Sequence, residues 1–172
     1  MPIFRILLNT LKVKYGITGT ALHWYSSYLA DRSFSIVING ITSDSFPICC
    51  GVPQGSCLGP LLFTKYASSF FDVVYKHLPS VHGYADDQQL YISFTSNDNK
   101  GQRSAVLTME HCLRDVKDWM FSQKLKMNDS KTEVILFATK QQLAKVNFDS
   151  IKVCESDIKI VDCVKNLAWL SL

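Results

Sequence analysis

The sequence predicts an α+β fold in which helices cover one face of an antiparallel sheet. Residues 81–94 consist of two short apolar runs joined by adjacent carboxylates, a pattern that favours two strands and a tight turn. Residues 61–78 and 104–123 carry wide apolar stripes at helical spacing, which one face of such a sheet could bury. The Asn39-Gly40 pair indicates a second hairpin.

The composition is that of a globular protein. The 172 residues suffice for one domain with a hydrophobic core, or for part of a larger domain. With 47% hydrophobic and 19% charged residues, the chain is not a disordered tail. The net charge of +3 is compatible with a nucleic-acid partner but is too small to argue for one.

The cysteines are expected to be buried thiols. Six of them, at positions 49, 50, 57, 112, 154 and 163, form no Cys-x-x-Cys pair, so neither a zinc site nor a disulfide framework is indicated. We therefore expect an intracellular, reducing compartment, which the sequence does not narrow to nucleus or cytoplasm. Lys65, Asp72 and Lys76 interrupt the most apolar segment, so no membrane span is expected.

Two helices are predicted at the start of the chain. Apolar residues at positions 4, 7, 8, 11 and 15 predict a helix over residues 3–15, which Gly16 ends. Either Thr18 or Thr20 caps a second helix that runs through residues 23–29.

A hairpin and a long helix follow. Residues 34–41 are typical of a strand entering the Asn-Gly turn, and residues 45–50 form the returning strand, with Pro47 at an edge. Pro60 suits the first turn of the long helix, and Pro79 ends it.

The second half of the chain predicts a loop, a helix and further strands. Residues 95–101 are polar and loop-like, and Ser104 opens a helix with apolar positions spaced by three and four. Residues 132–137 are expected to form a strand in the same sheet as the 81–94 hairpin. In the tail, residues 151–172, apolar and polar residues alternate, which predicts two or three strands around positions 155 and 156.

The carboxylates of Asp86 and Asp87 form the first candidate site. Neighbouring side chains on a regular strand point to opposite faces, so the pair acts together only if the chain bends, as a hairpin tip allows. Two crowded carboxylates are most easily explained by a hard cation, Mg²⁺ or Mn²⁺, and the alternative is a solvated Asp-Asp turn. His77 and His82 are poor further ligands, because no third nitrogen or sulfur occurs at suitable spacing.

A glycine- and proline-rich segment, Gly-Val-Pro-Gln-Gly-Ser-Cys-Leu-Gly-Pro at residues 51–60, precedes the carboxylates. It cannot form a regular element, but it can form a bent loop whose backbone approaches a ligand before a helix starts. In order and separation, this loop and the Tyr-Ala-Asp-Asp of residues 84–87 resemble the reverse transcriptases of non-LTR (LINE-type) retrotransposons. Residues 125–132 are similar to that family's Leu-x-Leu-Asn-x-x-Lys-Thr pattern, with Met127 in place of the second leucine.

The resemblance implies a polymerase palm that transfers nucleotides with two metal ions about 4 Å apart. By the same resemblance, Asp86 would be a principal metal ligand and catalytic residue, Asp87 its weaker partner, and Tyr84 would lie beneath the primer terminus. The loop residues that would bind the incoming nucleotide and template are Pro53, Gln54, Gly55 and Ser56. Lys131 matches the family's lysine near the triphosphate, and a solvated surface lysine is the alternative.

One part of the family's pattern has no counterpart in the 172 residues. The family's other catalytic aspartate lies in an Asp-Leu-Ser-x-Ala-Phe-Asp-like stretch, and neither Asp31 nor Asp44 has such neighbours. The family's Leu-Gly near the end is here Leu167-Ala168. If the family's glycine adopts a positive φ, alanine at position 168 would strain the turn by about 1 kcal/mol. We expect residues 1–172 to form part of the fingers and palm, an incomplete fold truncated after the first aspartate strand, without thumb or endonuclease. An exposed sheet edge would then favour self-association.

The sequence leaves two functional hypotheses. In the first, the chain is the palm fragment of an RNA-directed DNA polymerase, which uses an RNA template, a DNA primer, deoxynucleoside triphosphates and Mg²⁺ or Mn²⁺. In the second, the chain is a non-catalytic retroelement remnant that at most binds nucleic acid or a partner.

Overall fold

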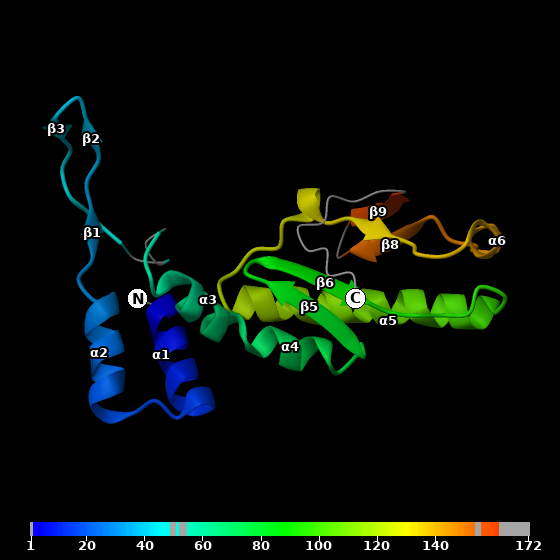
Figure 1. Cartoon of the computed structure of the whole chain (residues 1–172), viewed down its shortest axis with the longest axis horizontal. Helices are drawn as coiled ribbons and strands as arrows, with labels where there is room; N and C mark the ends of the chain where they lie inside the picture. Colours follow the sequence, from blue (N-terminus) through cyan, green and yellow to red (C-terminus); the bar gives the residue numbers. More distant parts are fainter. Residues whose placement is uncertain (1, 49–50, 52–54, 154–155, 162–172) are drawn as a thin grey trace. The chain divides into compact units, whose positions relative to one another are not determined.

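The computed structural model describes residues 2–48, 51, 55–153 and 156–161 as an α+β arrangement. Its contacts divide the chain into two compact units, Met1–Ser69 and Phe70–Leu172 (Figure 1). Each unit buries apolar side chains of its own. Within the described residues, none of the helices has the length and apolar character needed to cross a membrane.

Three helices make up most of the first unit. They are α1 (Pro2–Tyr15), α2 (Gly19–Leu29) and α3 (Gly59–Ala67). The apolar stripe of α1 is buried at Phe4, Leu7 and Leu11, and α1 contacts both other helices. Gly16, at φ +66°, follows α1 as predicted. Thr18 precedes α2, but its side chain makes no capping hydrogen bond, so the predicted cap is correct in position only.

A β-ribbon lies between α2 and α3 in the sequence. Its segments are β1 (Ser33–Phe34) paired with β4 (Phe46–Pro47), and β2 (Val37–Ile38) paired with β3 (Ile41–Thr42). Asn39 and Gly40 have φ of +50° and +79°, which confirms the predicted turn. Ser43 N donates to Ile36 O at 2.9 Å, but Ile36 N donates to Ser43 Oγ at 3.0 Å, so a side chain takes the place of one backbone acceptor where the predicted strand divides in two. Every residue of the four segments is exposed.

The predicted helix over residues 61–78 is wrong in its continuity, because two helices occupy this stretch. The first, α3, ends at Ala67, and α4 covers Ser69–Val74. At the break, the Ser68 hydroxyl donates to Lys65 O at 2.8 Å, and the Ser68 N–H reaches the same carbonyl at 3.4 Å. A serine that bonds to helix carbonyls in this way weakens and bends a helix. Helix α4 also ends before Pro79 is reached.

The core of the second unit lies between α4, a hairpin and α5. The hairpin pairs β5 (Ser80–Tyr84) with β6 (Asp87–Tyr91), and α5 spans Asn99–Ser122. The buried residues of this core are Phe70, Val74, Leu78, Val81, Cys112 and Val116. The α-helices therefore pack on the predicted hairpin, although that hairpin forms a two-stranded sheet of its own.

The two cysteines within the described residues differ in exposure. Burial, with a smaller effect of the Asp115 carboxylate, raises the pKa of the Cys112 thiol to about 11, so Cys112 is unreactive at neutral pH. Cys57 is a free, exposed thiol, which corrects the prediction that the cysteines are buried. The positions of the other four cysteines lie outside the described residues.

Helix α5 begins at Asn99 and not at the predicted Ser104. The Asp98 carboxylate accepts a hydrogen bond from Lys100 N at 3.0 Å and so satisfies one of the free N–H groups of the first turn. The polar residues that suggested a loop therefore include the helix cap.

Gln102 fixes two loops to α5. Its side chain is buried, with 2% of the residue exposed. The amide Nε2 donates to Ser96 O at 2.7 Å and to Lys145 O at 2.9 Å, and Oε1 accepts from Asn147 N at 2.9 Å. Because a buried amide without partners would be costly, these bonds hold both loops in place.

A three-stranded sheet completes the second unit. Its strands are β7 (Val134–Ile135), β8 (Ser150–Val153) and β9 (Ser156–Val161), in the order β7-β9-β8. The antiparallel pairing of β8 with β9 confirms the predicted strand pair around residues 155 and 156. The prediction that residues 132–137 join the sheet of the Asp-Asp hairpin is wrong, because β7 pairs in parallel with β9. Strand partners are set by packing of distant segments, which a local pattern does not contain.

Two short helical segments flank β7. The 3₁₀ turn η1 covers Asp129–Lys131, and α6 covers Lys140–Leu143. Thr139 and Gln142 form a capping box at the start of α6. Ala168, at which the family's pattern changes, lies outside the described residues.

Candidate active site

Asp86 and Asp87 lie at the tip of the β5–β6 hairpin. Tyr84 pairs with Asp87, so Ala85 and Asp86 form a two-residue turn. Ala85 has φ +55°, a left-handed conformation that tight hairpin turns require and that a β-carbon disfavours. The bend expected from the sequence is therefore present, with Asp86 in the turn and Asp87 as the first residue of β6.

The Gln88 side chain braces this turn. Its Nε2 donates to Ala85 O at 3.2 Å. A β-carbon at Gly83 would collide with Gln88 Oε1 and would lie 3.0 Å from Phe71 Cζ. Glycine at position 83 thus leaves room for the glutamine that holds the carbonyl before Asp86. No role for Gln88 was apparent from the sequence, because its place opposite Gly83 depends on the register of the two strands.

The hairpin tip carries negative charge without compensation. Both carboxylates are exposed, and so is Tyr84, at 76%. Among the described residues, no hydrogen bond or ion pair engages either carboxylate, and no group of three His, Cys, Asp or Glu could hold a metal. The tip therefore offers the hard oxygen ligands that Mg²⁺ or Mn²⁺ prefers, but only part of a coordination shell.

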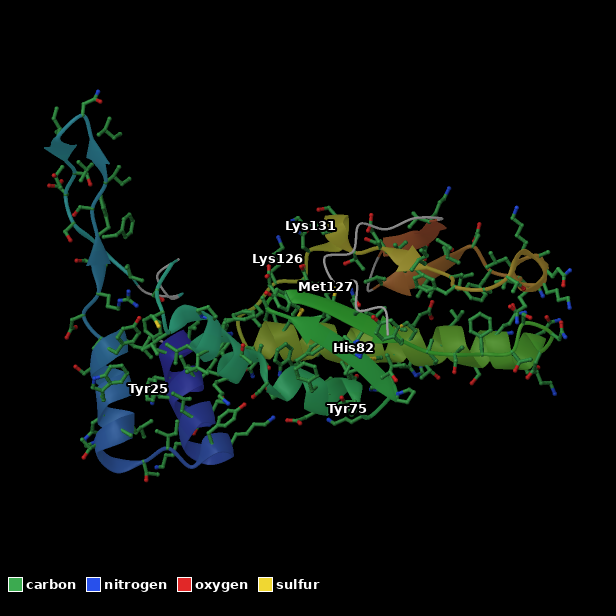
Figure 2. The ribbon with its side chains drawn as sticks, viewed as in Figure 1. Tyr25, Tyr75, His82, Lys126, Met127 and Lys131 are labelled. Carbon is green, nitrogen blue, oxygen red and sulfur yellow. The ribbon has the colours of Figure 1, made fainter. Side chains whose placement is uncertain are left out.

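The two histidines near the hairpin make contacts with other side chains. His77 Nε2 lies 2.8 Å from Asp115 Oδ2 on α5. The ring of His82 on β5 meets the Tyr91 ring edge-on at 5.4 Å between centroids (Figure 2). Neither contact makes a metal site with Asp86.

The glycine-rich loop belongs to the first unit. Pro53 and Gln54 lie outside the described residues. Gly55 is exposed at φ +80°, with nothing within 4 Å of an added β-carbon, so its conformation and not its space favours glycine. The Ser56 hydroxyl accepts a hydrogen bond from Gly59 N at 3.0 Å and thereby caps α3. The structure gives Ser56 a local structural role that the sequence did not indicate.

Lys131 is exposed at the end of η1, where its backbone N–H donates to Asn128 O at 3.1 Å. A cavity of about 450 Å³ adjoins this turn. Its lining residues are Lys126, Met127, Asn128 and Ser130. In the described part of the chain, no hydrogen bond or ion pair joins Lys131 to the hairpin carboxylates.

The model of the family described as "Reverse transcriptase (RNA-dependent DNA polymerase)" matches residues 5–167. The chain belongs to the reverse transcriptase family. The resemblance that rested on the glycine-rich loop and the Tyr-Ala-Asp-Asp hairpin is thereby confirmed.

The relatives of this family member include proteins of mobile elements. The "RNA-directed DNA polymerase from mobile element jockey" of Drosophila melanogaster is 28% identical over 120 residues, which are 66% of this chain and 12% of the relative. The "Probable RNA-directed DNA polymerase from transposon X-element" of the same species is 25% identical over 134 residues, 77% of this chain and 14% of the relative. The chain thus spans a small part of these relatives. No solved structure gives a significant match.

Ala85→Gly is expected to raise the free energy of unfolding of this chain by up to about 1 kcal/mol, because glycine adopts a positive φ without the steric cost of a β-carbon. The matched control is Ala144→Gly, because Ala144 has an ordinary φ of −61°. This substitution is expected to lower the free energy of unfolding by roughly 0.5–1 kcal/mol. Urea unfolding followed by circular dichroism measures both. Equal destabilisation by the two substitutions would contradict the turn conformation.

Proposed function

We propose that this chain is the part of an RNA-directed DNA polymerase that presents the Asp86 and Asp87 carboxylates to the primer terminus. The observation that carries the proposal is an exposed carboxylate pair on a tight hairpin in a member of the reverse transcriptase family. Divalent metal ions held there would stabilise the attacking and leaving oxygens as the primer 3′-hydroxyl attacks a nucleoside triphosphate. An RNA template, a DNA primer and deoxynucleoside triphosphates are the proposed substrates.

Within this proposal, Asp86 is the principal metal ligand and Asp87 the weaker one. Asp86 lies in the turn itself, where no described side chain competes for its oxygens. Asp87 begins β6, and its backbone is paired with Tyr84, so strand pairing restricts it more than Asp86. Tyr84 is exposed beside it and is assigned the position beneath the primer terminus. Palm geometry and the choice between Mg²⁺ and Mn²⁺ belong to the proposal.

The remaining assignments concern the incoming nucleotide. Its proposed loop contacts, with the template, are Pro53, Gln54, Gly55 and Ser56. Support comes from the exposed, left-handed backbone of Gly55, while the Ser56 hydroxyl holds the loop to α3. Lys131 is proposed to neutralise or protonate the leaving pyrophosphate, for which an exposed ammonium group is suited.

A polymerase is favoured over a non-catalytic remnant. Both motifs are intact in the sequence, and the printed names of the two relatives describe polymerases. We propose that the 172 residues form part of the fingers and palm. Because the described residues group only two carboxylates, a third would have to come from a segment outside them. The free thiols of Cys57 and Cys112 support a reducing, intracellular compartment.

Metal binding tests the carboxylate pair directly. Mn²⁺ is expected to bind weakly at the hairpin tip, since two carboxylates leave most of its coordination to water. Paramagnetic broadening of backbone NMR signals should then be selective for residues 83–88. Asp86→Asn should remove the broadening, and Asp118→Asn, at an exposed site on α5, should keep it. The absence of selective broadening in the unmodified chain, or equal broadening in the two variants, would refute Asp86 and Asp87 as metal ligands.

Primer extension tests the activity. The 172-residue chain is expected not to extend a DNA primer on an RNA template, because two carboxylates do not assemble the aligned two-metal geometry. Joined to fingers and an Asp-Leu-Ser-x-Ala-Phe-Asp-like strand, it should gain Mg²⁺-dependent incorporation. Asp86→Asn in that enzyme should lower kcat by about 100-fold or more, and Asp87→Asn by less, because asparagine keeps the shape but removes the charge.

The control in that assay is Asp118→Asn, which should leave kcat unchanged. DNA synthesis by the 172-residue chain alone would show that the third carboxylate is not needed. An extended enzyme that tolerates Asp86→Asn would refute the role of Asp86.

We also propose self-association through exposed sheet edges. The β-ribbon carries large apolar side chains that are 49–76% exposed: Phe34, Ile36, Val37, Ile38, Ile41 and Phe46. No charged residue lies between Arg32 and Asp44 to oppose pairing with a second strand.

Val37→Lys is therefore expected to lower the apparent mass in light scattering at tens of micromolar, because a charge on an edge strand disfavours pairing. Val13→Lys is the matched control, since Val13 on α1 is 74% exposed and lies outside the ribbon. A wild-type chain that is a monodisperse monomer at this concentration would contradict self-association.

A further inference from the structure

We propose that a groove between α1 and α2 binds the phosphate backbone of a nucleic acid, through residues other than those assigned to nucleotide transfer. The two helices lie side by side (Figure 1). The groove has a volume of about 430 Å³. Its lining residues are Arg5, Leu8, Asn9, Lys12 and Leu22.

The polar residues of the groove share one face of α1. Arg5, Asn9 and Lys12 are separated by four and three residues, the spacing that places side chains above one another on a helix. At 1.5 Å per residue, Arg5 and Lys12 are about 10 Å apart along the axis. Leu8 and Leu22 are half-buried beside them and give the groove an apolar floor. Two cations flanking an amide over an apolar floor suit the phosphates and sugars of a nucleotide strand.

Arg5 and Lys12 differ from the other cations of the first unit. The engaged cations are Lys14, which donates to Ser68 O at 3.2 Å; Arg32, which lies 5.3 Å from the Tyr28 ring centroid; and Lys65, which lies 4.0 Å from the Tyr15 ring centroid. Within the described residues, Arg5 and Lys12 have no hydrogen-bond or ion-pair partner. The two unengaged cations of this unit therefore line the same groove.

The groove also has no acidic neighbour in the sequence. Residues 1–30 contain no aspartate or glutamate, so the charges of Arg5 and Lys12 are not offset within α1 or α2. An unopposed cation pair favours a ligand that carries anionic groups in series, as a nucleic-acid backbone does. An acidic peptide shares this charge, but a family described as an RNA-dependent DNA polymerase favours nucleic acid.

Binding of a fluorescent single-stranded RNA, followed by anisotropy over a series of salt concentrations, tests the groove. Arg5→Gln with Lys12→Gln is expected to weaken binding by about tenfold at 0.1 M salt. It should also reduce the slope of log K against log[salt] by about 1.4, or 0.7 for each lost phosphate contact. The matched control is Lys100→Gln with Arg103→Gln, two exposed cations of α5, which should leave both quantities unchanged.

Each alternative has its own outcome. Equal weakening by both double variants would overturn the proposal in favour of a general effect of net charge. Competition by polyglutamate as strong as by unlabelled RNA would overturn it in favour of an acidic protein partner. Inorganic phosphate at millimolar concentration should not displace the labelled RNA. Full displacement would overturn the proposal and show that the groove binds a free anion only. Asp86→Asn removes a carboxylate that repels RNA, so without divalent ions it should not weaken RNA binding. A loss of RNA binding in the Arg5 and Lys12 double variant is therefore distinguishable from a failure of the carboxylate assignment.

Discussion

The burial of Val81 among apolar side chains of α4 and α5 holds the candidate site in place. A two-stranded hairpin is only marginally stable by itself, and this one ends in two carboxylates that repel each other. Val81 is 7% exposed and packs with Val74, Leu78 and Cys112, so the hydrophobic effect acts at the base of the hairpin. The core therefore stabilises β5 and β6 while their tip stays in solvent. The buried Val81 and the exposed carboxylates of Asp86 and Asp87 are thus separated by only a few residues of the hairpin.

The β2–β3 and β5–β6 hairpins both have a two-residue turn, but different residues adopt the positive φ. Each turn needs a positive φ, which Asn39 and Gly40 adopt at little cost. Ala85 adopts it at a cost of about 1 kcal/mol, and no glycine relieves the turn that carries Asp86. The Gln88 amide and the core at the base offset that cost. The strained turn thus occurs at the candidate site, and the unstrained turn occurs in the ribbon, which packs on no core.

Features set by neighbouring residues could be predicted from the sequence, and features set by distant ones could not. The apolar stripe of α1, the glycine after it, both hairpins and the place of Asp86 in a turn depend on a few consecutive residues. The break at Ser68 and the early start of α5 are also local, but they depend on single side-chain hydrogen bonds, from Ser68 and to Asp98, that periodicity does not register. The pairing of β7 with β9 depends on residues far apart in the chain. The bracing by Gln88 became visible only with the strand register.

The nucleic-acid binding proposed for this chain would have to come from local charge and not from its total charge. A net charge of +3 over 172 residues is weak, and at physiological ionic strength charges further apart than about 8 Å are largely screened from each other. The unpaired carboxylates of Asp86 and Asp87 would repel a polyanion until metal ions neutralise them. Cationic side chains that bind a nucleic-acid strand must therefore lie within contact distance of its phosphates. They must also be free of hydrogen bonds, ion pairs and aromatic-ring contacts with other residues of the protein. In the first unit, Arg5 and Lys12 are the described cations that meet the second condition, which is why the groove on α1, and not the overall composition, supports an interaction with nucleic acid.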